Sequence, residues 1–190
     1  MGEKPFKFGF MIGRFQHMHI GHEHVINKAL SICENLLILV GSSQESGTLR
    51  NPFDALTRID IIKKVYENRV MVGFIPDLTN ENDHSYEWGD FVLKSVNQWK
   101  TIFGISSAPD LMVYGNDEER NSWFRPESVE KISHLKLSRG VIDISATKMR
   151  QLIMDDDQLL WAEYANPKIH RYFSRLQDKL NAIPEYQRGK

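Results

Sequence analysis

Short apolar runs alternate along the chain with segments whose apolar residues recur at helical spacing. The runs predict strands over residues 6–12, 36–40, 69–75 and 111–114. The run 36–40 reads LLILV with no polar position, which is typical of a parallel strand covered on both faces. Apolar residues three and four positions apart predict helices over 21–34, 53–68 and 86–101. This alternation predicts an α/β fold in which a central parallel sheet is flanked by helices.

The pattern is weaker in the second half of the chain. Residues 115–139 follow neither period, whereas residues 141–144 predict a fifth strand. Helices are predicted over 147–154 and 167–180, and residues 185–190 have the composition of a frayed tail. We therefore expect a single domain over residues 1–190, with a C-terminal helical part that begins at about residue 147.

Composition excludes several classes of protein. With 41% hydrophobic and 26% charged residues in 190, the chain has the profile of a globular domain that folds without disulfides. The single cysteine, Cys33, excludes an internal disulfide and a multi-cysteine zinc site. A net charge of −1 argues against binding to nucleic acid. No signal peptide or membrane-spanning run is visible, so we expect a cytoplasmic protein that binds no membrane.

The loop after the first strand carries the clearest chemical signal. In an open parallel sheet, ligands bind beyond the carboxyl ends of the strands, and this loop, 13–22, reads GRFQHMHIGH. His19 and His22 lie three residues apart at the start of a predicted helix, and Gly21 adds no bulk between them. Two imidazoles beside the unpaired N–H groups of a helix start form a small anion site. The alternative is a capped turn in which the histidines occur by chance.

Zinc is a second alternative for this loop. His17, His19, His22 and His24 fall within eight positions, and histidines at such spacing can bind zinc. We consider zinc weaker than phosphate, because zinc sites of this kind usually recruit a carboxylate or thiolate from elsewhere.

The loop after the second strand, 41–53, reads GSSQESGTLRNPF. Its small residues let the backbone approach a ligand, and Arg50 can place a planar cation on a phosphate. A solvated loop that precedes a helix has the same composition, so this alternative stays open.

The segment 143–150, which reads DISATKMR, pairs a helix start with basic residues. Ser145 or Thr147 can cap the helix. Lys148 and Arg150 then lie in the first turn, where the helix dipole disfavours cations. This mismatch favours a bound anion. The alternative is a capped helix with exposed basic residues, at a cost of about 0.3–1 kcal/mol.

Taken together, these motifs resemble a known superfamily. The pairing of GRFQ-x-x-H-x-G-H with a later IS-x-T-x-x-R resembles the nucleotidylyltransferases, which have a Rossmann-like fold. Within that superfamily, GSSQ followed by LRNPF and Arg58 is similar to nicotinamide-nucleotide adenylyltransferase of the archaeal type. The segments NDHSYEW (82–88), YGN (114–116) and SAT (145–147) follow in the order of that family. The resemblance covers about residues 8–180.

The resemblance implies an enzyme that joins ATP and nicotinamide mononucleotide into NAD and pyrophosphate. It implies magnesium held mainly by substrate phosphates, without metal ligands from the chain, and a homo-oligomer. The ATP site that it implies comprises Gly13, Arg14, Phe15, His19, Gly21, His22, Ser145, Thr147 and Arg150. The implied site for the mononucleotide or NAD comprises Ser42, Arg50, Trp88 and Asn116, with Trp88 stacked on the nicotinamide ring. The implied catalytic residues are Arg14, His19, His22, Arg50 and Arg150.

Two departures from the family pattern are visible. His17-Met18 stands where the family usually has Pro-Phe, and Leu56-Thr57-Arg58 stands where it tends to have Gly-Glu-Arg. The first leaves both motif histidines in place. We expect the second to lie on a helix surface, with little effect on chemistry.

Two other functions remain open. One is a cytidylyltransferase acting on a phospho-alcohol, although that branch usually has an RTEGISTT-like stretch where this chain has GVIDISAT. The other is a non-catalytic regulatory module that binds nucleotides, which the intact histidines and arginines of the motifs argue against. The sequence does not distinguish nicotinamide from nicotinate mononucleotide.

Overall fold

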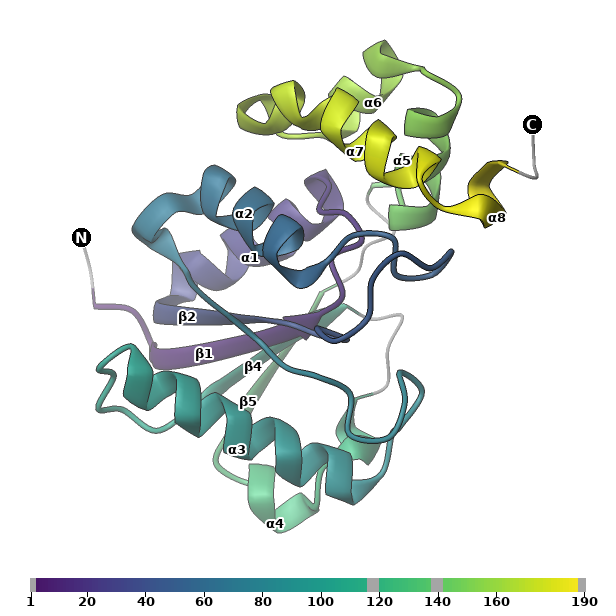
Figure 1. The fold of residues 1–190 in the computed structure, drawn as a ribbon. Helices are drawn as coiled ribbons and strands as arrows, with labels where there is room; N and C mark the ends of the chain where they lie inside the picture. The colour runs from purple at the N-terminus through teal and green to yellow at the C-terminus, as the bar shows by residue number, and fades with distance from the viewer. Residues whose placement is uncertain (1–2, 116–119, 138–141, 188–190) are drawn as a thin grey trace.

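The computed structural model describes residues 3–115, 120–137 and 142–187. The strands among these residues form one sheet in the order β3-β2-β1-β4-β5, with every pairing parallel (Figure 1). They are β1 (Phe6–Gly13), β2 (Cys33–Val40), β3 (Met71–Phe74), β4 (Leu111–Gly115) and β5 (Ser133–Leu137). The predicted α/β fold with a central parallel sheet is confirmed.

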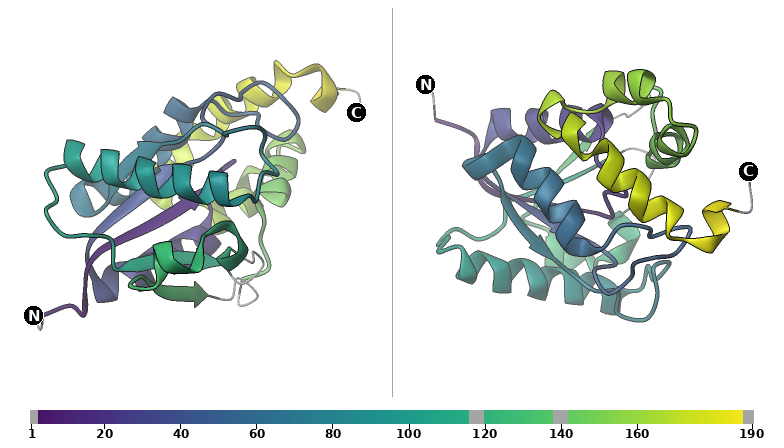
Figure 2. Two further views of the ribbon diagram at one scale, coloured as in Figure 1. Left: turned by 90° about the horizontal axis from the view of Figure 1, so that it is seen from below. Right: turned by 45° about the horizontal axis from the view of Figure 1, so that its top comes forward.

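Helices cover both faces of the sheet. One face carries α1 (Ile20–Ile32) and α2 (Ala55–Tyr66), and the other carries α3 (Tyr86–Ile102) and α4 (Pro126–Val129) (Figures 1 and 2). The C-terminal helices lie on the side of α1 and α2. They are α5 (Ala146–Met154), α6 (Gln158–Tyr164), α7 (Phe173–Asn181) and α8 (Pro184–Gln187). Three 3₁₀ turns, η1 (Glu67–Arg69), η2 (Asn121–Trp123) and η3 (Pro167–Tyr172), complete the described elements.

The central strand β1 contributes to two apolar cores. Successive side chains of a strand point to opposite faces of the sheet. Met11 accordingly packs in the core under α1, α2 and the C-terminal helices, whereas Phe8 and Phe10 pack in the core under α3. Because β2 is covered in the same way, the segment 36–40 tolerates no polar residue.

The fifth strand lies at 133–137, so the predicted strand at 141–144 is wrong. Residue 141 is outside the described residues, and residues 142–144 form no strand. The apolar signal at Ile144 comes from core packing just before α5 and not from a strand. The segment SHLKL at 133–137 gives little signal because β5 is an edge strand and most of its side chains are exposed or half-buried.

The helical pattern also missed two C-terminal helices. The Asp157 carboxylate accepts a hydrogen bond from the Leu160 N–H and thereby caps α6, so part of the acidic run 155–157 serves as a helix start. Residues 184–187 form α8, so the expectation of a tail frayed from residue 185 is wrong for 185–187. The helix predicted over 167–180 is the 3₁₀ turn η3 followed by α7.

A buried hydrogen bond joins the C-terminal helices to the loop after β1. The indole Nε1–H of Trp161 on α6 donates to Nε2 of His17 at 2.9 Å, and both side chains are fully buried. His17 Nδ1 donates to the carbonyl of Met18. Both ring nitrogens of His17 are therefore satisfied in the neutral imidazole. Burial disfavours the charged form and lowers the pKa of His17 from 6.5 to about 4.

This shift predicts acid destabilisation through His17. Between about pH 6.5 and 4 the unfolded chain binds a proton at this residue and the folded chain does not. We expect this residue to lower the free energy of unfolding by about 3 kcal/mol across that range and to contribute nothing above it. Urea unfolding of His17→Asn at several pH values checks this, because the variant should lose stability less steeply on acidification than the wild type.

The exposed His24 provides the control. His24→Asn removes a histidine whose side chain is solvated, so it should keep the wild-type slope. Identical slopes for the wild type and His17→Asn would contradict the prediction, whatever the absolute stability of the variant.

Candidate active site

The turn between β1 and α1 fixes the two motif histidines. His19 is the N-cap of α1, and its Nδ1 accepts the Gly21 N–H at 3.1 Å. The His19 N–H donates in turn to Nδ1 of His22 at 3.4 Å. Because each neutral ring accepts at Nδ1, each carries its proton at Nε2. The ring centroids lie 4.0 Å apart, so the start of α1 holds the two imidazoles side by side, and both residues are buried.

Gly21 is required by this packing. A Cβ at this position would lie 2.9 Å from both Cε1 and Nδ1 of His19. It would also lie 3.5 Å from Cγ2 of Ile144. The same spot therefore brings the histidine motif against the segment that leads into α5. Any larger residue at 21 would push the His19 ring out of its cap position.

Arg58 on α2 holds together the loops that follow β1 and β2. Its guanidinium is fully buried and donates to the carbonyl oxygens of Arg14 (2.8 Å), Gly41 (2.7 Å) and Ser42 (3.1 Å). Burial lowers the pKa of Arg58 to about 10, which still leaves it charged at neutral pH. The expectation that 56–58 lies on a helix surface is therefore correct only for Leu56, which is exposed.

Arg14 and Arg50 meet at a single carboxylate oxygen. Oε2 of Glu81 lies 3.0 Å from Arg14 Nη1 and 3.0 Å from Arg50 Nε. Asn51 donates to the same oxygen at 3.3 Å. Exposed ion pairs of this kind add little stability. Their importance is geometric, because three N–H donors converge on one oxygen as they would on a phosphate oxygen.

These two arginines line a cavity of about 470 Å³ at the carboxyl ends of β1 and β2. Gly13, Ser42 and Trp88 of the predicted site also line it. Ser42 donates from Oγ to Asp77 at 3.0 Å, which fixes the hydroxyl on the cavity wall. Trp88 is largely buried, with 6% of its surface exposed, and it packs into the core under α3. Asn116 lies outside the described residues.

Arg150 lies at a second cavity of about 470 Å³, which Thr147 and Arg50 also line. Arg150 is buried and donates to the Gln16 carbonyl and, at 3.2 Å, to Oγ1 of Thr147. Ser145 is the N-cap of α5, as predicted, and accepts the Lys148 N–H at 3.2 Å. Lys148 is exposed. Because Arg50 lines both cavities, the two spaces adjoin at that residue.

Phe15 packs beside His22 of the histidine pair. Its ring is buried and lies 5.0 Å from that of His22, centroid to centroid. The φ angle of Phe15 is 50°, in the left-handed region that residues other than glycine rarely adopt.

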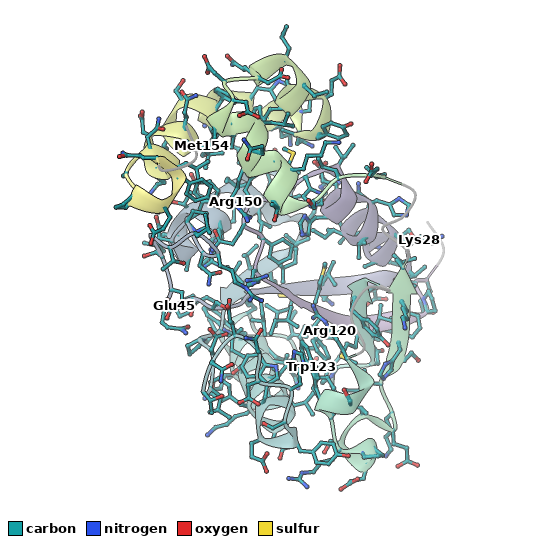
Figure 3. All side chains as sticks on the ribbon, turned by 90° about the vertical axis from the view of Figure 1, so that its right-hand side faces the viewer. Lys28, Glu45, Arg120, Trp123, Arg150 and Met154 are labelled. Atoms are coloured by element: carbon teal, nitrogen blue, oxygen red, sulfur yellow. The ribbon has the colours of Figure 1, made fainter. Side chains whose placement is uncertain are left out.

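The sequence patterns missed several residues that line the first cavity. Arg120 donates to the Ile12 carbonyl at 2.7 Å, and its guanidinium carbon lies 4.9 Å from the centre of the Trp123 ring (Figure 3). His84 stacks on Trp123 with ring centroids 5.1 Å apart. Arg120 and Trp123 fall in the stretch 115–139, which follows no period. The signal that could have found them is their place directly after β4, at the ligand-binding edge of the sheet.

Within the described ranges no three histidine, cysteine, aspartate or glutamate side chains are grouped as a metal site. No helix among the described residues is long and apolar enough to cross a membrane.

The chain is similar in sequence to nicotinamide-nucleotide adenylyltransferases. It is 27% identical to the enzyme of Aeropyrum pernix over 92% of this chain and 96% of the relative. It is 35% identical to the enzyme of Saccharolobus solfataricus over 50% of this chain and 56% of that relative. These relatives confirm the predicted resemblance to the archaeal type.

The fold is similar to that of a solved bifunctional NMN adenylyltransferase/ADP ribose pyrophosphatase from Francisella tularensis, complexed with AMP and a manganese ion. The TM-score is 0.72 at 18% identity, and the match covers 96% of this chain and 53% of that protein. The chain thus spans about half the length of the bifunctional protein. At this identity the likeness concerns the fold.

A family model described as cytidylyltransferase-like matches residues 10–152. The matched stretch runs from within β1 through most of α5. It therefore includes the histidine pair, the loops that carry Arg14 and Arg50, and Arg150. The chain belongs to the cytidylyltransferase-like family of nucleotidyltransferases.

Proposed function

We propose that this protein transfers AMP from ATP to nicotinamide mononucleotide, giving NAD and pyrophosphate. The observation that carries the proposal is the meeting of phosphate-binding groups at one edge of the sheet. The histidine pair lies at the start of α1, which follows β1. Arg14 and Arg50 lie in the loops after β1 and β2, and Arg150 lies on α5. The full-length similarity to adenylyltransferases of this specificity supports the same substrates.

The reaction is an in-line displacement. A phosphate oxygen of the mononucleotide attacks the α-phosphorus of ATP, a new P–O bond forms, and the bond to pyrophosphate breaks. The attacking phosphate is already ionised at neutral pH, so no general base is needed. Catalysis then depends on alignment and on neutralising the charge of the transferring and leaving phosphates.

In this proposal, residues at different places in the site align the substrates and neutralise the phosphate charge. The Nε2–H groups of His19 and His22 are fixed by their caps, so they bind a phosphate oxygen without reorganising. Arg14 and Arg50 turn from Glu81 to the substrate phosphates. Gly13 and Phe15 lie along the nucleotide, and Ser145 and Thr147 place hydroxyl or backbone donors at the start of α5. Asn116 would contact the mononucleotide.

A divalent cation fits this site as part of the substrate. The carboxylates at the first cavity are engaged, since Asp77 accepts from Ser42 and Gln44 while Glu81 binds Arg14 and Arg50. They form no dedicated cage, so magnesium would be held mainly by phosphates and water, as is usual for this ion. When bound, the ion neutralises phosphate charge.

Trp88 is proposed to hold the nicotinamide ring. It lies on the wall of the first cavity beside Trp123, with the two ring centroids 6.4 Å apart. A planar, π-faced ligand stacks well on such a surface. A homo-oligomer and a cytoplasmic location stay predictions.

Product analysis tests the function. The purified protein is incubated with magnesium and ATP plus nicotinamide or nicotinate mononucleotide, and separately with CTP plus phosphocholine. We expect NAD and pyrophosphate from ATP and nicotinamide mononucleotide. Turnover only with CTP would move the protein to the cytidylyltransferases, and ATP binding without turnover would indicate a regulatory module.

Replacing a motif histidine should abolish most activity without unfolding the protein. Loss of one preorganised donor commonly raises the barrier by about 2.7–4 kcal/mol. His19→Ala should therefore lower kcat by about a hundredfold or more. His24→Ala, on the exposed side of the same helix, is the matched control and should retain wild-type turnover. Normal turnover in His19→Ala would remove this residue from the mechanism.

Replacing Trp88 should affect one substrate selectively. Trp88→Phe keeps an aromatic ring in the core but reduces the stacking surface, so KM for the mononucleotide should rise several-fold while KM for ATP stays near the wild-type value. Trp99→Phe is the control, because Trp99 lies on α3 away from this cavity and packs on Phe74. Equal changes in both KM values would rule out the stacking role.

A further inference from the structure

The hydroxyl of Tyr186 on α8 bridges two segments of the proposed phosphate site. It accepts a hydrogen bond from Arg150 Nε at 2.8 Å. It also donates to the carbonyl oxygen of Leu49 at 2.9 Å. Figures 1 and 2 show α8 beside the loop that follows β2, far along the chain from it. One hydroxyl thus joins α5, α8 and the loop that carries Arg50.

The fold sets the position of this hydroxyl. Ile183, just before α8, is buried with 3% of its surface exposed. The Tyr186 N–H donates to the Ile183 carbonyl at 3.1 Å, and the Tyr186 ring packs against the core under the C-terminal helices. The hydroxyl therefore meets Arg150 because Ile183 anchors the chain just before Tyr186 and the Tyr186 ring is itself packed.

Three protein acceptors determine how the guanidinium of Arg150 lies. The group has five N–H donors in a rigid fork. Nε–H binds Tyr186, one Nη1–H binds the Gln16 carbonyl, and one Nη2–H binds Thr147. The two remaining N–H groups have no hydrogen-bond partner among the described residues. Arg150 lines the second cavity, so these are the donors left for an anionic ligand.

Without the Tyr186 hydroxyl, Nε–H would lose its acceptor and the fork would be held from one end only. The Leu49 carbonyl would lose a donor at the same time, and Leu49 directly precedes Arg50. Both arginines that line the second cavity therefore depend on this single oxygen. The ring of Tyr186 contributes packing, and its oxygen contributes orientation.

We propose that Tyr186 is a positioning residue for nucleotidyl transfer, which orients Arg150 and the backbone beside Arg50 toward the triphosphate of ATP. The proposal rests on the proposed function, because it assigns Arg150 and Arg50 to the phosphates. It places part of the machinery at the C-terminal end of the described chain, outside the family match at 10–152.

Tyr186→Phe tests this most directly, because it removes only the oxygen. Loss of a hydrogen bond to a charged group should reduce kcat/KM for ATP about tenfold. KM for the mononucleotide should change less than KM for ATP, since Arg150 does not line the first cavity and Trp88, the proposed stacking residue there, does not contact Tyr186. The matched control is Tyr164→Phe on α6, whose hydroxyl makes no hydrogen bond within the described ranges. It should leave both substrates unaffected.

A double-mutant cycle separates positioning from a general structural role. If Tyr186 acts chiefly through Arg150, then adding Tyr186→Phe to Arg150→Ala should lower kcat/KM for ATP by about threefold or less instead of about tenfold, because only the contact with the Leu49 carbonyl remains to be lost. Additive effects would overturn the proposal. So would equal losses for both substrates together with a lower free energy of unfolding.

ATP binding keeps the test independent of the mononucleotide. Calorimetric titration with ATP and magnesium should give an affinity about tenfold weaker in Tyr186→Phe and unchanged in Tyr164→Phe. If the wild type forms no dinucleotide from either pyridine mononucleotide, the proposed function fails, yet this titration still tests Tyr186. Equal ATP affinity in the wild type and Tyr186→Phe would overturn the proposal.

Discussion

The buried guanidinium of Arg58 is the interaction on which the site depends. Loops that leave the carboxyl ends of parallel strands carry carbonyl groups that need donors once they are buried. Arg58 supplies three N–H groups to carbonyls of the loops after β1 and β2. A buried charge is tolerated there because its hydrogen bonds are made. Both loops can then place Arg14, Ser42 and Arg50 around one cavity.

The C-terminal helices form part of the same site. The Trp161–His17 hydrogen bond ties α6 to the loop that leads into the histidine pair, and Arg150 ties α5 to the Gln16 carbonyl of that loop. Gln16 itself hydrogen-bonds the backbone of Phe53, just before α2, through both its oxygen and its nitrogen. The short segment before α1 is therefore held from two sides. Such support keeps donors in place before a substrate arrives, which is the condition for efficient electrostatic catalysis.

Glu81 balances the charge of the two arginines at the first cavity. Two arginines that face one point would repel each other, and Glu81 supplies the opposing charge from the loop after β3. This carboxylate lies where donors suited to phosphate converge. In the proposed reaction, a substrate phosphate that carries more charge and more acceptor oxygens would replace it.

By itself, the sequence determined four strands of the central sheet, its main helices and the place of the histidine pair at a helix start. The apolar run 36–40 reflects burial on both faces of the sheet. The helical spacing around it reflects helices with one buried face. Both patterns are local properties of the chain. The His19 cap is local as well, because Gly21 and His22 lie within three residues of it. The loop after the second strand and the basic helix start indicated Arg50 and Arg150, and motif resemblance added Arg14. A phosphate-binding role stays a prediction for each residue.

Only the tertiary structure decided which distant segments meet. The edge strand β5 was misplaced because a strand with one neighbour and solvated side chains leaves little hydrophobic signal. Arg120 and Trp123 became visible only when β4 was placed beside β1. Tyr186 had the sequence context of a frayed tail, yet it contacts residues 36 and 137 positions away. No period within a short window encodes contacts at such separation, because they depend on how the helices pack across the sheet.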